Sequence, residues 1–165
     1  MTELYLGLGS NLGDREANIN AALALLETAL GCVAKAVSRI IETKSWGFEA
    51  PAFLNCIALY ELEADVRNPE KEGKEILDIC KKTEAQLGRT DAQATKDGVF
   101  RSRPIDVDIL FYGRERICTP RLTVPHLDMK ERDFVMLPLR EIASDDIMRE
   151  FPEIFGDEDL FSYDC

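Results

Sequence analysis

The residues with the clearest chemical potential lie in the stretch RSRPIDVDILFYG, residues 101–113. Alternate residues of an extended strand point to the same side, about 6.5 to 7 Å apart, so Asp106 and Asp108 would share one face. The apolar residues between them would anchor the opposite face to a core. Two carboxylates fixed side by side are suited to hold hard cations such as Mg²⁺. On this stretch alone, a half-exposed strand whose acids simply face water remains an equal alternative.

A cationic segment surrounds this strand in a chain that is otherwise acidic. The net charge is −11, yet residues 89–132 hold nine Lys or Arg against seven Asp or Glu and include His126, the only histidine. The negative net charge argues against nucleic acid or an anionic membrane as the main partner. The local cations instead indicate a small polyanionic ligand, with chance clustering as the alternative. The forked guanidinium donors suited to phosphate oxygens are those of Arg89, Arg101, Arg103, Arg121 and Arg132.

Together, the same-face aspartates and the arginines resemble equipment for phosphoryl transfer, in which carboxylates hold Mg²⁺ and guanidiniums neutralise developing charge. Phe53, Asn55 and Phe134 could supply two aromatic faces and an amide edge for a flat heterocycle. Core packing is the alternative for each ring taken singly. The glycine-rich stretch GLGSNLG, residues 7–13, is interpreted as a structural turn, because it lacks the glycine that a dinucleotide-binding loop requires at position 12.

The elements that must position these residues follow from apolar periodicity and turn signals. They are a strand at 4–9, a helix from Asp14 to Gly31, strands at 33–43 and 53–62, a helix from Asn68 to Gly88, and the strand within 101–113. A β-α-β-β-α-β order predicts an α+β fold with a ferredoxin-like core, in which helices pack on a mostly antiparallel sheet. We expect residues 1–165 to form a single domain with an acidic C-terminal tail from about residue 144.

The composition is that of an ordinary soluble globular protein, with 45% hydrophobic and 31% charged residues. The N-terminal stretch MTELYLGLGS has no basic region and too short an apolar run for a signal peptide. No stretch approaches the roughly 20 apolar residues that cross a bilayer. We therefore expect a cytoplasmic protein without membrane partners, and a monomer or at most a weak dimer.

Four signatures in this order resemble one enzyme family. They are GSNLGD at 9–14, FLN at 53–55, RPIDVDI at 103–109 and RLTVPHLDMKERDF at 121–134. From Leu4 to about Ala143 the chain is similar to 6-hydroxymethyl-7,8-dihydropterin pyrophosphokinase, an enzyme of folate biosynthesis. The resemblance implies a ferredoxin-like fold and two Mg²⁺ ions. It also implies transfer of the terminal pyrophosphoryl group of ATP to the pterin hydroxymethyl oxygen, which leaves AMP.

The resemblance also implies a role for individual residues. The Mg²⁺ ligands would be Asp106 and Asp108. The pterin would lie between the rings of Phe53 and Phe134, with its polar edge bound by Asn55 and the Thr43 backbone. The residues implied to bind ATP are Arg103, Arg121, Thr123, His126 and Arg132. Those implied to act in transfer are Arg89 and Arg103, together with the two aspartates.

The chain departs from the family pattern at Arg101, where a small residue is usual, at Phe100 in place of tryptophan, and at Leu127 in place of a frequent aromatic residue. The polar segment 90–102 is also longer than in many relatives, and we expect it to be mobile and to close over the substrates. Two alternatives to the pyrophosphokinase stay open. One is a non-catalytic ferredoxin-like module that binds a ligand, and the other is a Mg²⁺-dependent phosphotransferase with another acceptor.

Overall fold

The structure is a computed structural model that describes residues 1–44, 51–90 and 102–156. The expectations about Phe100, Arg101 and nearly all of the segment 90–102 therefore lie outside the described residues. The same holds for the C-terminal residues after 156.

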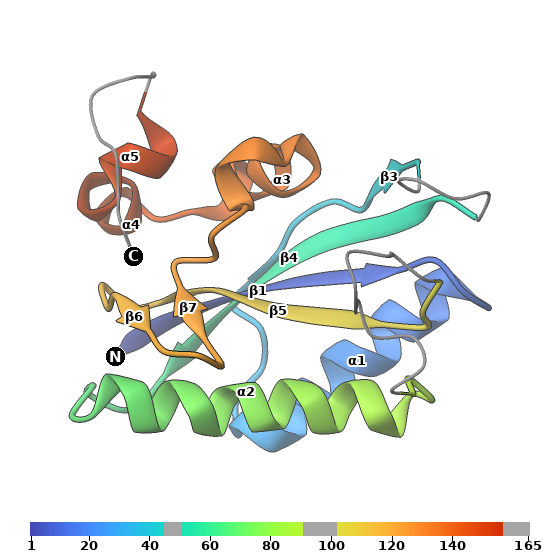
Figure 1. Cartoon of the computed structure of the whole chain (residues 1–165), viewed down its shortest axis with the longest axis horizontal. Coiled ribbons are helices and arrows are strands. Elements are labelled where there is room, and N and C mark those ends of the chain that lie inside the picture. The colour runs from blue at the N-terminus through green and yellow to red at the C-terminus, as the bar shows by residue number, and fades with distance from the viewer. Residues whose placement is uncertain (45–50, 91–101, 157–165) are drawn as a thin grey trace.

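The main sheet contains five strands (Figure 1). They are β1 (Thr2–Ser10), β2 (Ala36–Val37), β3 (Ile41–Thr43), β4 (Phe53–Leu62) and β5 (Asp106–Tyr112). The strand order is β2-β4-β1-β5, β3 also pairs with β4, and every pairing is antiparallel. This confirms the α+β class and the ferredoxin-like arrangement, with the expected second strand divided into β2 and β3. A separate short pair consists of β6 (Ile117–Cys118) and β7 (Thr123–Val124).

Two helices cover one face of the main sheet (Figure 1). Helix α1 (Arg15–Leu30) begins after Asp14, whose carboxylate accepts a hydrogen bond from a backbone N–H of the first turn, and ends at Gly31 with φ 75°. Helix α2 (Pro69–Gln86) begins in the same way after Asn68. Both starts confirm the sequence signals. No helix among the described residues is long and apolar enough to cross a membrane.

The opposite face of the sheet is covered in part by the C-terminal third of the chain (Figure 1). This part contains the 3₁₀ turn η2 (Met129–Glu131) and the helices α3 (Asp133–Ile142), α4 (Asp145–Glu150) and α5 (Pro152–Phe155). The first part of the segment expected as an acidic C-terminal tail from about residue 144 therefore contains two short helices. These helices pack on the sheet because Ile147, Phe151 and Phe155 recur every four residues and are all buried.

Aromatic contacts attach these last helices to the sheet. The ring of Phe111 on β5 is completely buried, and its centroid lies 5.0 Å from that of Phe151 and 5.7 Å from that of Phe155. Tyr5 on β1 meets the same Phe111 ring edge-on at 5.7 Å. Large buried rings contribute strongly to a core, so the second face depends on this cluster.

We expect Phe151→Ala to lower the free energy of unfolding by about 3 to 5 kcal/mol, because it leaves a cavity beside Phe111. Leu137→Ala is the control, since Leu137 on α3 is 56% exposed and its truncation should cost less than about 1 kcal/mol. Urea denaturation measures both changes. Equal, small effects of the two substitutions would show that the C-terminal helices are not part of the core.

Candidate active site

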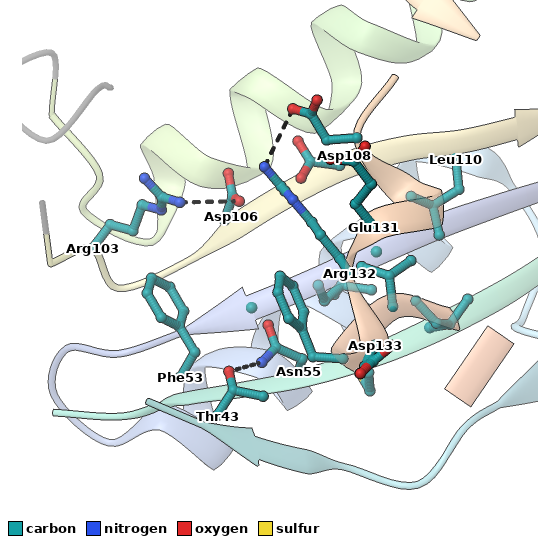
Figure 2. A pocket seen from close by; sticks show the side chains of 18 of the residues that line it. Thr43, Phe53, Asn55, Arg103, Asp106, Asp108, Leu110, Glu131, Arg132 and Asp133 are labelled. Carbon is teal, nitrogen blue, oxygen red and sulfur yellow. Dashed lines mark hydrogen bonds and ion pairs between the residues drawn. The ribbon is translucent and has the colours of Figure 1, made fainter. Parts of the chain in front are cut away.

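A pocket of about 850 Å³ lies on the sheet face that carries α3. Its floor is β1, where Gly7 and Gly9 leave room that larger side chains would fill. Gly9 pairs with Asn55 of β4 on one side and with Asp106 of β5 on the other, and Gly7 pairs with Asp108. The two neighbouring strands therefore place an amide and two carboxylates along opposite walls of one pocket (Figure 2).

One wall of the pocket combines a fixed amide with aromatic rings. Asn55 is 8% exposed, and its Nδ2 donates a hydrogen bond to Thr43 Oγ1 at 3.0 Å (Figure 2). A Cβ at Gly9 would lie 2.9 Å from Asn55 Oδ1, so glycine is needed for this amide position. Phe53 and Phe134 also line the pocket. The structure thus brings together all four residues that the resemblance assigned to a pterin.

The other wall is a cluster of carboxylates and guanidiniums around Asp106. Arg89 Nη1 lies 2.7 Å from Asp106 Oδ1. Arg103 Nη2 lies 3.4 Å from Asp106 Oδ2 (Figure 2). The guanidinium of Arg103 also lies 5.4 Å from the centroid of the Phe53 ring. Arg103 therefore bridges the aromatic wall and the charged wall of the pocket.

Sequence reasoning missed Glu84, which supports this cluster from α2. Its side chain is 3% exposed. One carboxylate oxygen pairs with Arg89 and accepts the Val107 N–H at 3.1 Å, and the other lies 3.1 Å from Lys81 Nζ. The sequence contains one signal for this burial. Glu84 lies four residues after Cys80, so it falls on the apolar face of the helix. An acid at such a position indicates a paired buried charge.

The environment separates the pKa values of the three carboxyls. Burial opposes ionisation of Asp106, but Arg103 and Arg89 outweigh it and hold the pKa of Asp106 below its ordinary value. Burial, followed by the charges of Asp106 and Glu84, raises the pKa of Asp108 to about 8. Burial and Asp106 also raise the pKa of Glu84. Negative charge is therefore in excess at Asp108.

A second pocket of about 380 Å³ adjoins the first, and Asp108 and Asp128 line both. It collects three of the residues implied to bind ATP, namely Arg121, Thr123 and His126, together with Lys81 of α2 and Leu127. Burial, and then the charge of Arg132, lowers the pKa of His126.

Two of the arginines implied to bind ATP lie near acidic partners outside the cluster around Asp106. Arg121 Nη2 lies 3.3 Å from Asp78 on α2, and Arg132 lines the larger pocket with its Nη2 3.4 Å from Asp128. Four charged side chains that sequence reasoning did not single out also line the larger pocket, namely Lys44, Asp128, Glu131 and Asp133. Three of these lie within the matching motif at 121–134.

Asp106 and Asp108 could supply two of the oxygen ligands of a hard cation. Asp106 and Asp108 present oxygen ligands on one face of β5, and the raised pKa of Asp108 reflects negative charge that a divalent cation would offset. Within residues 1–44, 51–90 and 102–156, no three His, Cys, Asp or Glu side chains form a group that could hold a metal ion. Mg²⁺ commonly binds one or two carboxylates and takes its other ligands from water and substrate phosphates. The pair fits that mode of binding.

The larger pocket has a fixed amide, aromatic rings and guanidiniums, and it shares the carboxylates Asp108 and Asp128 with a second, cationic pocket. These are the parts of a phosphotransferase with two substrates. Comparison with known proteins gives the particular family. Residues 5–144 match the family model of 7,8-dihydro-6-hydroxymethylpterin-pyrophosphokinase. The chain therefore belongs to this family of pyrophosphokinases, which use ATP.

Curated relatives agree with this membership. The chain is 41% identical over 145 residues to the 2-amino-4-hydroxy-6-hydroxymethyldihydropteridine pyrophosphokinase of Porphyromonas gingivalis. The matched region covers 87% of this chain and 92% of that protein. It is 40% identical over 140 residues to the enzyme of the same name from Bacillus subtilis, covering 84% of this chain and 77% of that protein. A mitochondrial folate synthesis bifunctional protein of Arabidopsis thaliana is 38% identical over 143 residues, covering 85% of this chain and 23% of that protein.

The charge excess at Asp108 predicts a pH-dependent stability. Its pKa is about 8 in the folded chain against an ordinary value of 3.8. Its contribution to stability is therefore complete below about pH 4 and is lost as the pH rises through about 8. In EDTA, the Tm of Asp108→Asn relative to the wild type should rise between about pH 5 and pH 8, reaching an advantage of about 3 °C or more above pH 8.

Differential scanning calorimetry across this range measures the effect, and the two proteins serve as each other's control because the remaining groups are shared. Added Mg²⁺ should reduce the advantage of the variant. Parallel Tm profiles of the two proteins in EDTA would contradict the charge excess at Asp108.

Proposed function

We propose that this chain transfers the terminal pyrophosphoryl group of ATP to the hydroxymethyl oxygen of 6-hydroxymethyl-7,8-dihydropterin in folate biosynthesis. The observation that carries the proposal is the row across the sheet, in which Asn55 and Asp106 face each other over Gly9. A flat ligand held at the amide would thus lie next to carboxylates that also border a second pocket. Two substrates can then meet at Asp108.

In the larger pocket, the pterin would stack between the rings of Phe53 and Phe134. The amide of Asn55 and the backbone of Thr43 would pair with its polar edge. The hydrogen bond from Asn55 Nδ2 to Thr43 Oγ1 supports this role, because it fixes the orientation of the amide before the ligand binds. A preorganised polar edge selects ligands that offer matching donors and acceptors.

The smaller pocket would take ATP. Thr123 would contact the nucleoside, while Arg121, His126 and Arg132 would hold the phosphates, together with Arg103. The lowered pKa of His126 favours a neutral imidazole, so His126 would act through hydrogen bonds rather than as a charge. The family membership, as a pyrophosphokinase, favours this use of the pocket over a non-catalytic ligand-binding module.

Asp106 and Asp108 would hold two Mg²⁺ ions with the ATP phosphates. When bound, Mg²⁺ supplies charge neutralisation and orientation of the phosphate chain. Arg89 and Arg103 already contact Asp106, so they lie where they could exchange a carboxylate for a phosphate oxygen. Guanidiniums aimed at a transferring phosphoryl group stabilise the charge that develops there.

The proposed step forms a bond between the pterin hydroxymethyl oxygen and the β-phosphorus of ATP. The bond from the β-phosphorus to the α–β bridging oxygen breaks, AMP leaves with the electron pair, and the hydroxyl proton is released to water. We further propose that the chain acts as one domain in the cytoplasm, as a monomer or at most a weak dimer. The cores on both faces of one sheet support the single domain.

Phosphorus NMR of a completed reaction tests the function. With ATP, Mg²⁺ and the hydroxymethyl dihydropterin, we expect AMP and a pterin diphosphate. The matched negative control is Asp106→Ala, which should slow AMP formation by at least about 100-fold while circular dichroism shows a retained fold. Formation of ADP with a pterin monophosphate would contradict the proposed reaction. Turnover only with a different acceptor would instead favour the alternative of a Mg²⁺-dependent phosphotransferase with another acceptor.

The pterin pocket is tested by Asn55→Ala. The substitution should weaken pterin binding by about 1 to 3 kcal/mol, or roughly 5- to 150-fold, because the polar edge loses its partner. Binding of an ATP analogue should change little, since the amide lies on the opposite wall from the charged cluster. Calorimetric titration of both ligands gives the comparison. Equal losses for the two ligands would count against a pterin site at Asn55.

A further inference from the structure

Asn11 is a buried polar residue that the proposed function leaves without a role. It directly follows β1 within the motif GSNLGD and is 0% exposed. Buried amides require partners, and Asn11 has them in two distant segments. Its Oδ1 accepts the backbone N–H of Arg103 at 2.8 Å, and its own backbone N–H donates to the Arg103 carbonyl oxygen at 3.2 Å. Its Nδ2 lies 3.4 Å from both the Pro51 carbonyl oxygen and Ser102 Oγ.

The two bonds to Arg103 fix the backbone from which its guanidinium extends. Arg103 is 8% exposed, and its side chain contacts Asp106 and lies over the Phe53 ring. Both its backbone N–H and its carbonyl are held by one residue, so the backbone has little freedom to rotate at this point. A small rotation there would displace the guanidinium from the carboxylate at the end of a long side chain.

The two contacts of the Asn11 amide nitrogen are longer than the hydrogen bonds between Asn11 and Arg103. At 3.4 Å they are longer than a typical hydrogen bond of 2.7 to 3.2 Å, whereas the bond from the Arg103 N–H is near the ideal length. They nevertheless place Pro51, two residues before the start of β4 at Phe53, next to Ser102. The ends of the two segments that border the pocket thus meet at a single side chain.

We propose that Asn11 is a positioning residue for pyrophosphoryl transfer, which acts by holding the Arg103 backbone so that its guanidinium lies between Phe53 and Asp106. The inference rests on the proposed function. It also gives the motif GSNLGD a purpose beyond a turn, since glycine clears the pocket floor and asparagine two residues later sets the position of the arginine.

Single-turnover kinetics with saturating ATP and pterin test this role. Asn11→Ala should slow transfer by about 100-fold, the cost of a misplaced catalytic group, with less than about fivefold change in the dissociation constant of the pterin. In an Arg103→Ala background, adding Asn11→Ala should slow transfer by less than about threefold, because Asn11 acts through Arg103. Additive losses in this cycle would overturn the proposal.

Two further variants separate positioning from a general effect on folding. Asn18→Ala is the matched control, because the Asn18 amide donates to the Leu12 carbonyl oxygen at 2.9 Å within the same turn and should leave transfer unchanged. Asn11→Asp keeps an oxygen acceptor for the Arg103 N–H and should recover at least about tenfold of the loss caused by alanine. A loss equal to that of Asn11→Ala would show that this acceptor is not what matters.

Hydrogen exchange of the Arg103 amide gives a readout without turnover. Exchange should accelerate at least about tenfold in Asn11→Ala and stay unchanged in Asn18→Ala. Equal exchange in the wild type and Asn11→Ala would overturn the proposed contact. Absence of AMP from the wild-type reaction would overturn the proposed function and the role of Asn11 with it, whereas AMP formation with additive losses would overturn the Asn11 proposal alone.

Discussion

Strand β1 pairs with β4 on one side and with β5 on the other, and this double pairing sets the positions of the groups on both pocket walls. The register places Asn55, Gly9 and Asp106 in one row. Because side chains alternate between the two faces of a sheet, a slip of one residue in either pairing would turn a wall of the pocket toward α1 and α2. The alternating apolar residues on the other face oppose such a slip, since they fill the core beneath those helices. Packing on one face of the sheet therefore protects the geometry of the site on the other.

The negative charges of the carboxylates in the site are only partly balanced by neighbouring cations. Asp106 has two guanidinium partners, whereas Asp108 has no ion pair within 4.0 Å among the described residues. The buried carboxylate of Glu84 is also paired. It forms ion pairs with Arg89 and Lys81 and accepts a hydrogen bond from a backbone N–H of β5. Buried ions are costly unless they are paired and hydrogen-bonded. Asp106 and Glu84 meet this condition through their pairs, whereas Asp108, which borders both pockets, has no such pair among the described residues.

Much of the fold and of the site was predictable because it depends on local rules. The i, i+2 spacing placed Asp106 and Asp108 on one face, and the side chains of Asp14 and Asn68 start helices as their positions indicated. Other features were not predictable because they depend on contacts between distant segments. The charges of Asp145 and Asp146 hid the buried side of the last helices, which becomes apparent only when Phe151 meets Phe111.

The site shows the same division between local and distant causes. Residue types and motif spacing named the amide, the rings and the arginines, but the hydrogen bonds from Asn11 to Arg103 join positions 92 residues apart and leave no local signature. Nor could the sequence say that Asp106 is satisfied by cations of the protein while Asp108 is not. That asymmetry has a chemical consequence for the proposed reaction. A cation brought in with the nucleotide gains most by approaching Asp108, where negative charge is in excess. This favours bringing the two substrates together at the boundary between the two pockets.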